Sequence, residues 1–294
     1  MRRTPASTSR QRHEWSIGIY TGDSPLDLAP AENAANPVLT REHVTDTSAR
    51  FVADPFMLKV DQTWHMFFEV MSRRTHRGEI GLATSPDGLN WKYRQIVLAE
   101  AFHLSYPYVF EWQGSYYMIP ETHKAGAVRL YRAARFPTQW SFVADLLSGH
   151  SFGDSSPFRF GDKWWLFTET NPTYNFDTLR LYYADDLSGP WIEHRRSPIV
   201  EGDARIARPG GRVLVTGERI IRYAQDCYPV YGSRVGAFEI TELTTTTYRE
   251  QTASERPVLA ASGSGWNASG MHHVDAHCLD SGRWIACVDG WVAA

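Results

Sequence analysis

Acidic residues recur at the ends of short aromatic segments that lie about fifty residues apart. Glu69, Glu121 and Glu169 each close such a segment, and Asp54 begins the first one, directly before a proline. Two carboxyl groups across one site suit glycoside hydrolysis, because one protonates the leaving oxygen while the other activates water or attacks carbon. We expect Asp54 to act as the base and Glu121 as the acid, with Asp154 tuning their pKa values by like charge.

A purely structural role is the alternative for these acids. A carboxylate at a repeated strand end can accept backbone N–H bonds that tie neighbouring parts of the chain together. We weigh this role above chemistry for Glu69 and Glu169 and below it for Asp54. For Glu121 both roles stay open.

Further polar residues lie beside the same positions in the sequence. Arg208 can grip a carboxylate, a phosphate or a sugar diol through its fork of donors, or it can form an internal salt bridge with Asp54 or Asp154. The segment 272–277 (HHVDAH) suits hydrogen bonding to a ligand better than metal binding, because one strand converges poorly on a cation. We therefore predict no metal and no cofactor. The predicted substrate-binding residues are His103, Tyr106, Glu169, Arg208, His272, His273 and Asp275.

A repeat of about fifty residues must position these side chains. Prolines at 55, 107, 157 and 209 are separated by 52, 50 and 52 residues, which indicates a repeat architecture. The segments are rich in Val, Ile, Phe, Tyr and Trp and are broken by Gly, Asp, Asn and Pro, as expected for strands. The first repeat predicts four strands, which make one propeller blade: Pro55–Val60, Thr63–Val70, Glu79–Ser85 and Trp91–Leu98.

The last repeat is incomplete, and the start of the chain holds its missing strands. His273–Leu279 and Arg283–Asp289 supply two strands, and residues 16–23 and Asn36–Thr40 resemble a third and a fourth. We predict an all-β, five-bladed β-propeller whose fifth blade is closed by N-terminal strands pairing with C-terminal strands. An open β-sandwich is the alternative, but it would not need complementary half-repeats at the two ends.

In a propeller the first strand of each blade lines the central channel, and its start lies beside the end of the second strand. All five blades should therefore point these positions at one mouth. The predicted strand starts are Asp54, Tyr106, Ser156, Arg208 and Val274, and the predicted strand ends are Glu69, Glu121, Glu169, Gln225 and Asp289. Most tryptophans, including Trp64, Trp164, Trp165 and Trp284, occupy second strands and are interpreted as core.

Composition limits the class of protein. The 294 residues are 43% hydrophobic, enough for one domain at 15–294 after a disordered tail at 1–14. A net charge of -3 without a basic run argues against a nucleic-acid partner, and no apolar stretch is long enough to span a membrane. Three cysteines and no secretory signal favour a reducing, cytoplasmic location. We expect a monomer that binds a carbohydrate or glycoconjugate.

The ordered set of motifs resembles a known family. An Asp-Pro that opens the first of five blades is similar to the furanosidase superfamily, which includes glycoside hydrolase family 43. More closely, the chain resembles the N-terminal domain of plant glucosamine inositolphosphorylceramide transferase and its bacterial relatives. The motifs that carry this resemblance are Trp15–Tyr20, Ala53–Pro55, His103–Pro107, Pro120–Thr122, Asp154–Pro157 and His272–Asp275.

The resemblance to hydrolases implies a base at Asp54, a pKa-tuning acid for which Asp154 is the nearest match, and a glutamate that opens blade four. Arg208 stands at that last position. Either Glu121 or Glu169 supplies the proton instead, or the fold binds sugar without cleaving it. In the plant relatives, transfer is attributed to a separate glycosyltransferase domain, so the resemblance does not bring that activity to these residues.

Two functions follow from these observations. The first is a carbohydrate-active protein that hydrolyses or transfers a glycosyl unit with paired carboxylates. The alternative is a non-catalytic glycan-binding propeller in polysaccharide or glycolipid biosynthesis. A protein-interaction propeller fits less well, because its binding face would not need buried acids.

Overall fold

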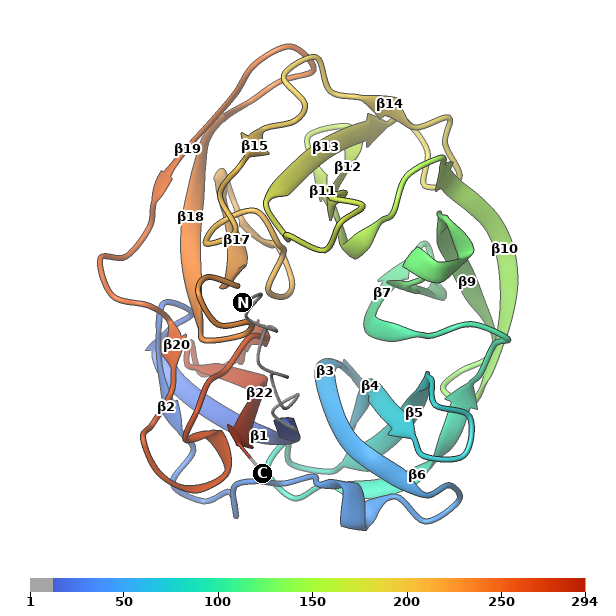
Figure 1. The fold of residues 1–294 in the computed structure, drawn as a ribbon, viewed down its shortest axis with the longest axis vertical. Helices are drawn as coiled ribbons and strands as arrows, with labels where there is room; N and C mark the ends of the chain where they lie inside the picture. The colour runs from blue at the N-terminus through green and yellow to red at the C-terminus, as the bar shows by residue number, and fades with distance from the viewer. Residues whose placement is uncertain (1–12, 294) are drawn as a thin grey trace, which may run out of the picture.

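The computed structural model describes residues 13–293, which form five antiparallel sheets arranged around a central axis (Figure 1). Each sheet has four or five strands, which confirms the predicted five-bladed propeller. The helical segments of this part of the chain are three short 3₁₀ turns: η1 (Arg41–His43), η2 (His123–Ala125) and η3 (Gly265–Asn267). Within residues 13–293, no helix has the length and hydropathy needed to cross a membrane.

The first three blades follow one another along the chain. Their sheets have the orders β3-β4-β5-β6, β7-β8-β9-β10 and β11-β12-β13-β14, and β15 also pairs with β13. Blade one consists of β3 (Ala49–Val60), β4 (Thr63–Ser72), β5 (Gly78–Ser85) and β6 (Lys92–Leu98). Blade two consists of β7 (Ser105–Trp112), β8 (Ser115–Glu121), β9 (Ala127–Arg135) and β10 (Gln139–Ser148). Blade three consists of β11 (Gly153–Phe160), β12 (Lys163–Glu169), β13 (Thr178–Ala184), β14 (Ile192–Glu193) and β15 (Val200–Glu201).

The last two blades complete the ring. Blade four consists of β16 (Leu214–Thr216), β17 (Arg219–Asp226), β18 (Arg234–Leu243), β19 (Tyr248–Thr252) and β20 (Leu259–Ala260). Blade five combines both ends of the chain in the order β2-β1-β22-β21, as predicted. Its strands are β21 (Val274–Cys278), β22 (Trp284–Ala293), β1 (His13–Ser24) and β2 (Asp27–Pro30).

Two boundaries at the start of the chain differ from expectation. The outer strand of blade five is β2 rather than Asn36–Thr40, which contributes a single bridge between Leu39 and Ile17. The tight turn after β1 lets the chain reverse at once, so the adjacent segment takes the edge. The predicted tail at 1–14 lies outside the described residues except for His13 and Glu14, which begin β1.

The first strands of blades one to three share a β-bulge at the mouth. Asp54, Tyr106 and Asp154 have positive φ angles of 53°, 46° and 47°, and the strand register shifts beside each of them. The structural counterpart of Asp54 in blade three is therefore Asp154, not Ser156 as the proline alignment predicted. The left-handed conformation aims each bulge N–H at a neighbouring carboxylate, and aspartate tolerates this conformation better than most residues do.

The channel is closed beneath the mouth by packed rings. Phe56, Tyr106 and His273 contact one another with ring centroids 4.5 to 5.2 Å apart, and all three side chains are buried. Apolar clusters between the blades form the rest of the core. As predicted, Trp64, Trp164 and Trp165 lie within these clusters.

Candidate functional site

A cavity of about 660 Å³ opens at the bulged end of the propeller axis. All five blades contribute to its lining, as expected if equivalent strand positions share one mouth. The predicted residues that line the cavity are Asp54, Glu69, His103, Glu121, Glu169, Arg208 and His272. The structure thus brings together seven polar side chains that are distant in the sequence.

Arg208 lies in an ion cluster on one side of the cavity. Its Nε donates to Asp154 Oδ2 over 2.6 Å, and its Nη2 donates to Glu121 Oε2 over 3.2 Å. Gln225 Nε2 also donates to Asp154, and the backbone N–H of Asp154 donates to Glu121. The internal salt bridge considered for Arg208 is therefore present, with Glu121 as an additional partner. Asp154 is 1% exposed and lies behind Arg208 rather than on the cavity wall.

One cation faces two carboxyl groups in this cluster. Burial raises the pKa of Asp154 well above its ordinary value, although Arg208 opposes this shift. Burial also acts on Glu121, but His123 and Arg208 outweigh it and hold the pKa of Glu121 below its ordinary value. Glu121 Oε1 accepts a bond from His123 Nδ1 over 2.7 Å. At neutral pH Glu121 is therefore ionised and already engaged by cationic and N–H donors.

Asp54 belongs to a second chain of contacts. Asp289 Oδ1 binds His272 Nδ1 over 2.8 Å, and His272 Nε2 faces Asp54 Oδ1 at 3.7 Å. The backbone N–H of Asp54 donates to Asp289 Oδ2. Burial raises the pKa of Asp54 to about 6, against the opposing effect of His272. Burial would lower the pKa of His272, but Asp289 and Asp54 outweigh it and raise that pKa.

The same three residues contain the atoms best placed to hold a cation. One ligand atom from each of Asp54, His272 and Asp289 lies within 4.8 Å of the other two. The hydrogen bonds between Asp289 and its two neighbours account for this proximity without an ion.

Glu69 and Glu169 complete the acidic lining. Burial raises the pKa of Glu69 well above its ordinary value, and the nearby acids reinforce the shift. Its Oε1 lies 3.3 Å from His103 Nε2. Burial raises the pKa of Glu169 to about 7, although the N–H of Asn171 bonds its carboxylate. Glu169 therefore lines the cavity and has a pKa near neutral pH, so its carboxyl group can give up or take up a proton there.

Three predicted substrate-binding residues lie beneath the cavity and do not line it. The hydroxyl of Tyr106 bonds Ser156 and Gly211, joining blades two, three and four. His273 Nε2 bonds the carbonyl of Pro55. Both side chains have no exposed surface and act as structural parts of the cavity floor.

The third of them, Asp275, binds other parts of the protein. It contacts Arg212 Nε, the N–H of Met57 and His277 Nε2. Through this contact His277 also has a structural role. Asp275 is fully buried, so its carboxylate serves to join blade five to blades one and four.

The repeat pattern did not mark an aromatic rim of the cavity, most of which lies on loops. Tyr174 and Phe176 follow blade three's second strand, Tyr231 follows that of blade four, and Trp15 lies on β1. The Arg208 guanidinium lies 4.6 Å from the centre of the Phe176 ring and 5.3 Å from that of Tyr231. Loop residues fall outside the repeat, so spacing did not mark them. The signal in the sequence is an aromatic residue five to seven positions after a strand-end acid or amide, here Glu169 or Gln225.

Comparison with known proteins identifies relatives over nearly the whole chain. The family described as "Glucosamine inositolphosphorylceramide transferase 1, N-terminal" matches residues 8–291. A protein named glucosamine inositolphosphorylceramide transferase 1 from Oryza sativa subsp. japonica is 38% identical over 296 residues, covering 94% of this chain and 40% of that protein. Its namesake from Arabidopsis thaliana is 36% identical over 299 residues, covering 94% and 39%. The chain therefore spans about 40% of the length of these relatives.

Solved structures share the fold at low sequence identity. A family 117 glycoside hydrolase from Zobellia galactanivorans has a TM-score of 0.57 at 14% identity, covering 95% of this chain and 91% of its own. A thermostable family-43 glycoside hydrolase has a TM-score of 0.53 at 14% identity, covering 69% and 76%. These similarities concern the propeller architecture.

Proposed function

This chain belongs to the family of N-terminal domains of glucosamine inositolphosphorylceramide transferase 1, and from this premise we propose that its central cavity binds a glycosyl unit of a glycoconjugate. The family resemblance inferred from the sequence is confirmed by this membership. The relatives' name describes proteins of which this chain spans about 40%, so their transferase activity is not assigned to these residues.

The observation that carries the proposal is the combination of acids and aromatic rings on one cavity. A pyranose or furanose ring offers hydroxyl donors to carboxylates and an apolar face to aromatic rings. Glu69, Glu121 and Glu169 supply acceptors, while Tyr174 and Phe176 supply ring faces at the rim. A volume of about 660 Å³ is large enough for one or two sugar units.

Binding without cleavage is favoured by the ion cluster. Arg208 and His123 engage Glu121, which keeps this carboxylate ionised and unable to give a proton to a leaving group. Asp154 is likewise bonded to Arg208 and shielded from the cavity. Two of the three acids predicted to be catalytic are thus held in protein contacts.

The test is a glycan screen followed by affinity measurements on matched tyrosine variants. Tyr174 is 50% exposed on the cavity rim, and Tyr228 is 58% exposed but outside the cavity lining. Tyr174→Ala should weaken binding of the best glycan about two- to tenfold, the usual worth of an aromatic contact, while Tyr228→Ala should leave it unchanged. Equal affinity in both variants would exclude a stacking role for the rim, and no binding in the screen would reject the proposal.

Glycoside hydrolysis is the second candidate, and the pKa values of two cavity acids favour it. Asp54, with a pKa of about 6, would act as the ionised base, and Glu169, with a pKa of about 7, would act as the acid. The base is active above its pKa and the acid below its own, so turnover should peak narrowly between about pH 6 and 7. Aryl furanosides and pyranosides are suitable substrates. Turnover that survives in both Asp54→Asn and Glu169→Gln would refute this mechanism.

A further inference from the structure

A second cavity, of about 540 Å³, lies beside the first between blades five and one. His13 lines both cavities, so the two adjoin at this residue. Besides His13, the ionisable residues of the second cavity are three arginines, one glutamate and a histidine: Arg41, Arg50, Arg73, Glu14 and His76. We call this cavity the arginine groove.

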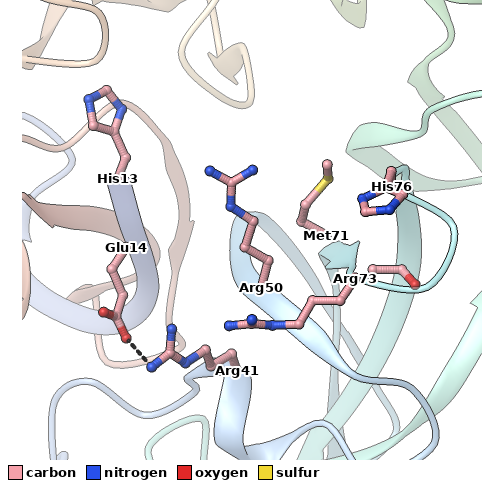
Figure 2. Close-up of a pocket in the computed structure, with 8 residues that line it drawn as sticks. His13, Glu14, Arg41, Arg50, Met71, Arg73 and His76 are labelled. Carbon is pink, nitrogen blue, oxygen red and sulfur yellow. Dashed lines mark ion pairs between the residues drawn. The ribbon is translucent and has the colours of Figure 1, made fainter. Parts of the chain in front are cut away.

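The three arginines reach the groove from separate segments. Arg41 belongs to the turn η1, Arg50 to β3, and Arg73 to the turn after β4. In Figure 2 the guanidinium of Arg41 points toward Glu14, the side chain of Arg73 extends toward Arg41, and Arg50 rises from β3 above both. Like charges gathered in one cavity repel each other, so an anion bound there would stabilise this arrangement.

The protein's own acids neutralise only part of this charge. Arg41 pairs with Glu14 at 3.2 Å and with Glu42 at 2.7 Å. Within residues 13–293, neither Arg50 nor Arg73 has a carboxylate partner. The lining groups, three arginines and one glutamate, carry a net charge of +2.

One of the unpaired arginines is held in place. Arg73 Nε donates to the carbonyl of Ala49 over 3.0 Å, which fixes the plane of the guanidinium and leaves its terminal donors available. Arg50 is exposed, so it can adjust to a ligand at little cost in stability. Arginine forks match the oxygens of phosphate well, and a phosphate monoester carries a charge of about -1.5 to -2 at neutral pH.

We propose that the arginine groove binds a phosphate group of the same glycoconjugate whose sugar occupies the central cavity, so that the ligand passes from one cavity to the other beside His13. This assignment rests on the proposed function for its sugar part, but the phosphate site itself is separable. The phosphate belongs either to a sugar phosphate or to a lipid headgroup. A net +2 groove suits such a group better than a single sugar carboxylate.

The first experiment is calorimetric titration at low ionic strength with inorganic phosphate, glucose 1-phosphate and glucose. The wild type is compared with Arg50→Ala, with Arg50→Lys, and with Arg256→Ala as a control from an exposed loop distant in the sequence. Arg50→Ala should weaken binding of both phosphates about tenfold, because a charged hydrogen bond and its Coulomb attraction are lost. The phosphate affinity of Arg50→Lys should lie between those of the wild type and Arg50→Ala, and the affinity of Arg256→Ala should match that of the wild type. Equal affinity in wild type and Arg50→Ala, or no phosphate binding by the wild type, overturns the proposal.

The second experiment assigns the source of the phosphate. Phosphatidylcholine vesicles with and without phosphatidylinositol are sedimented with each protein. Sedimentation that requires phosphatidylinositol and is lost in Arg50→Ala supports a lipid headgroup, whereas Arg50-dependent binding of soluble phosphates alone supports a sugar phosphate. Tyr174→Ala separates the two proposals, because it should weaken glycan binding and leave the binding of inorganic phosphate intact. Sugar binding in the central cavity and phosphate binding in the arginine groove can therefore be rejected independently.

Discussion

Replacing Arg208 by methionine should destabilise the propeller strongly at neutral pH. The side chain is 11% exposed and is the cation that faces both Asp154 and Glu121, whose side chains are 2% and 7% exposed. Arg208→Met keeps much of the contact with the rings of Phe176 and Tyr231 but removes the charge. Breaking a buried pair while leaving its acid behind costs about 3–5 kcal/mol.

The sign of the pH dependence follows from Glu121. Its folded-state pKa is depressed, so it contributes stability that is present above the unfolded value of 4.5 and is lost as the pH falls through the folded value. Without Arg208 this contribution shrinks, because the hydrogen bond from His123 is then left to oppose the effect of burial on Glu121. The difference between wild type and variant should therefore be large at pH 7 and shrink as the pH falls below 4.5.

The assay is urea unfolding of the full chain at pH 7 and at a pH below 4.5. Arg219→Ala is the matched control, because its exposed pair with Glu239 should cost less than about 1 kcal/mol. Adding Glu121→Gln to Arg208→Met should restore about 1–3 kcal/mol, the coupling expected for residues in one network. A loss below about 1 kcal/mol in Arg208→Met at pH 7, or a loss that does not change with pH, would refute the reasoning.

Three further predictions concern the layer beneath the cavity. Tyr106→Phe removes a buried hydroxyl that joins three blades and should cost about 1–3 kcal/mol in urea unfolding while leaving glycan affinity unchanged; a change in affinity at constant stability would contradict its structural role. Burial lowers the pKa of His273 from 6.5 to about 4, so this histidine contributes about 3 kcal/mol of unfolding free energy that is lost as the pH falls through this window, and His273→Gln should lose about 3 kcal/mol less than the wild type over the same window; identical pH profiles would reject this. Asp275→Asn leaves Arg212 buried without its counter-charge and should cost about 3–5 kcal/mol, seen as a lower melting temperature; an unchanged melting temperature would show that Arg212 finds another partner.

The repeat predicted the fold well because strand signals and turn signals recur with the same period. Thr63–Ser72 and Lys92–Leu98 in the structure match the predicted strands within two residues. The four-residue strand Asp27–Pro30 was missed because it is too short to show alternation and ends in a proline. The pairing of N-terminal with C-terminal strands was predicted correctly because β1 is long and has an apolar middle, whereas its edge neighbour β2 is short and polar.

The sequence predicted which residues converge on the mouth of the propeller, but not which of them line the cavity and which are buried beneath it. Equivalent strand ends do converge, so Asp54, Glu121 and Glu169 reach one cavity. The period could not tell which side chain points up into the mouth and which points down, because a bulge reverses that direction locally. Tyr106 therefore lies in the floor despite its position beside the mouth.

The closure of blade five has a consequence for the order of synthesis. Strand β1 pairs with β22 over a register that runs from His13 opposite Ala293 to Gly22 opposite Trp284. On a ribosome, β1 emerges before any other described strand, and its partner β22 is the last of the described strands to be translated. Blades one to four can assemble while the nascent chain grows, but β1 must stay free of wrong partners throughout. A chain truncated just before residue 284 would lack β22, so β1 would have an unpaired edge and blade five could not close the ring.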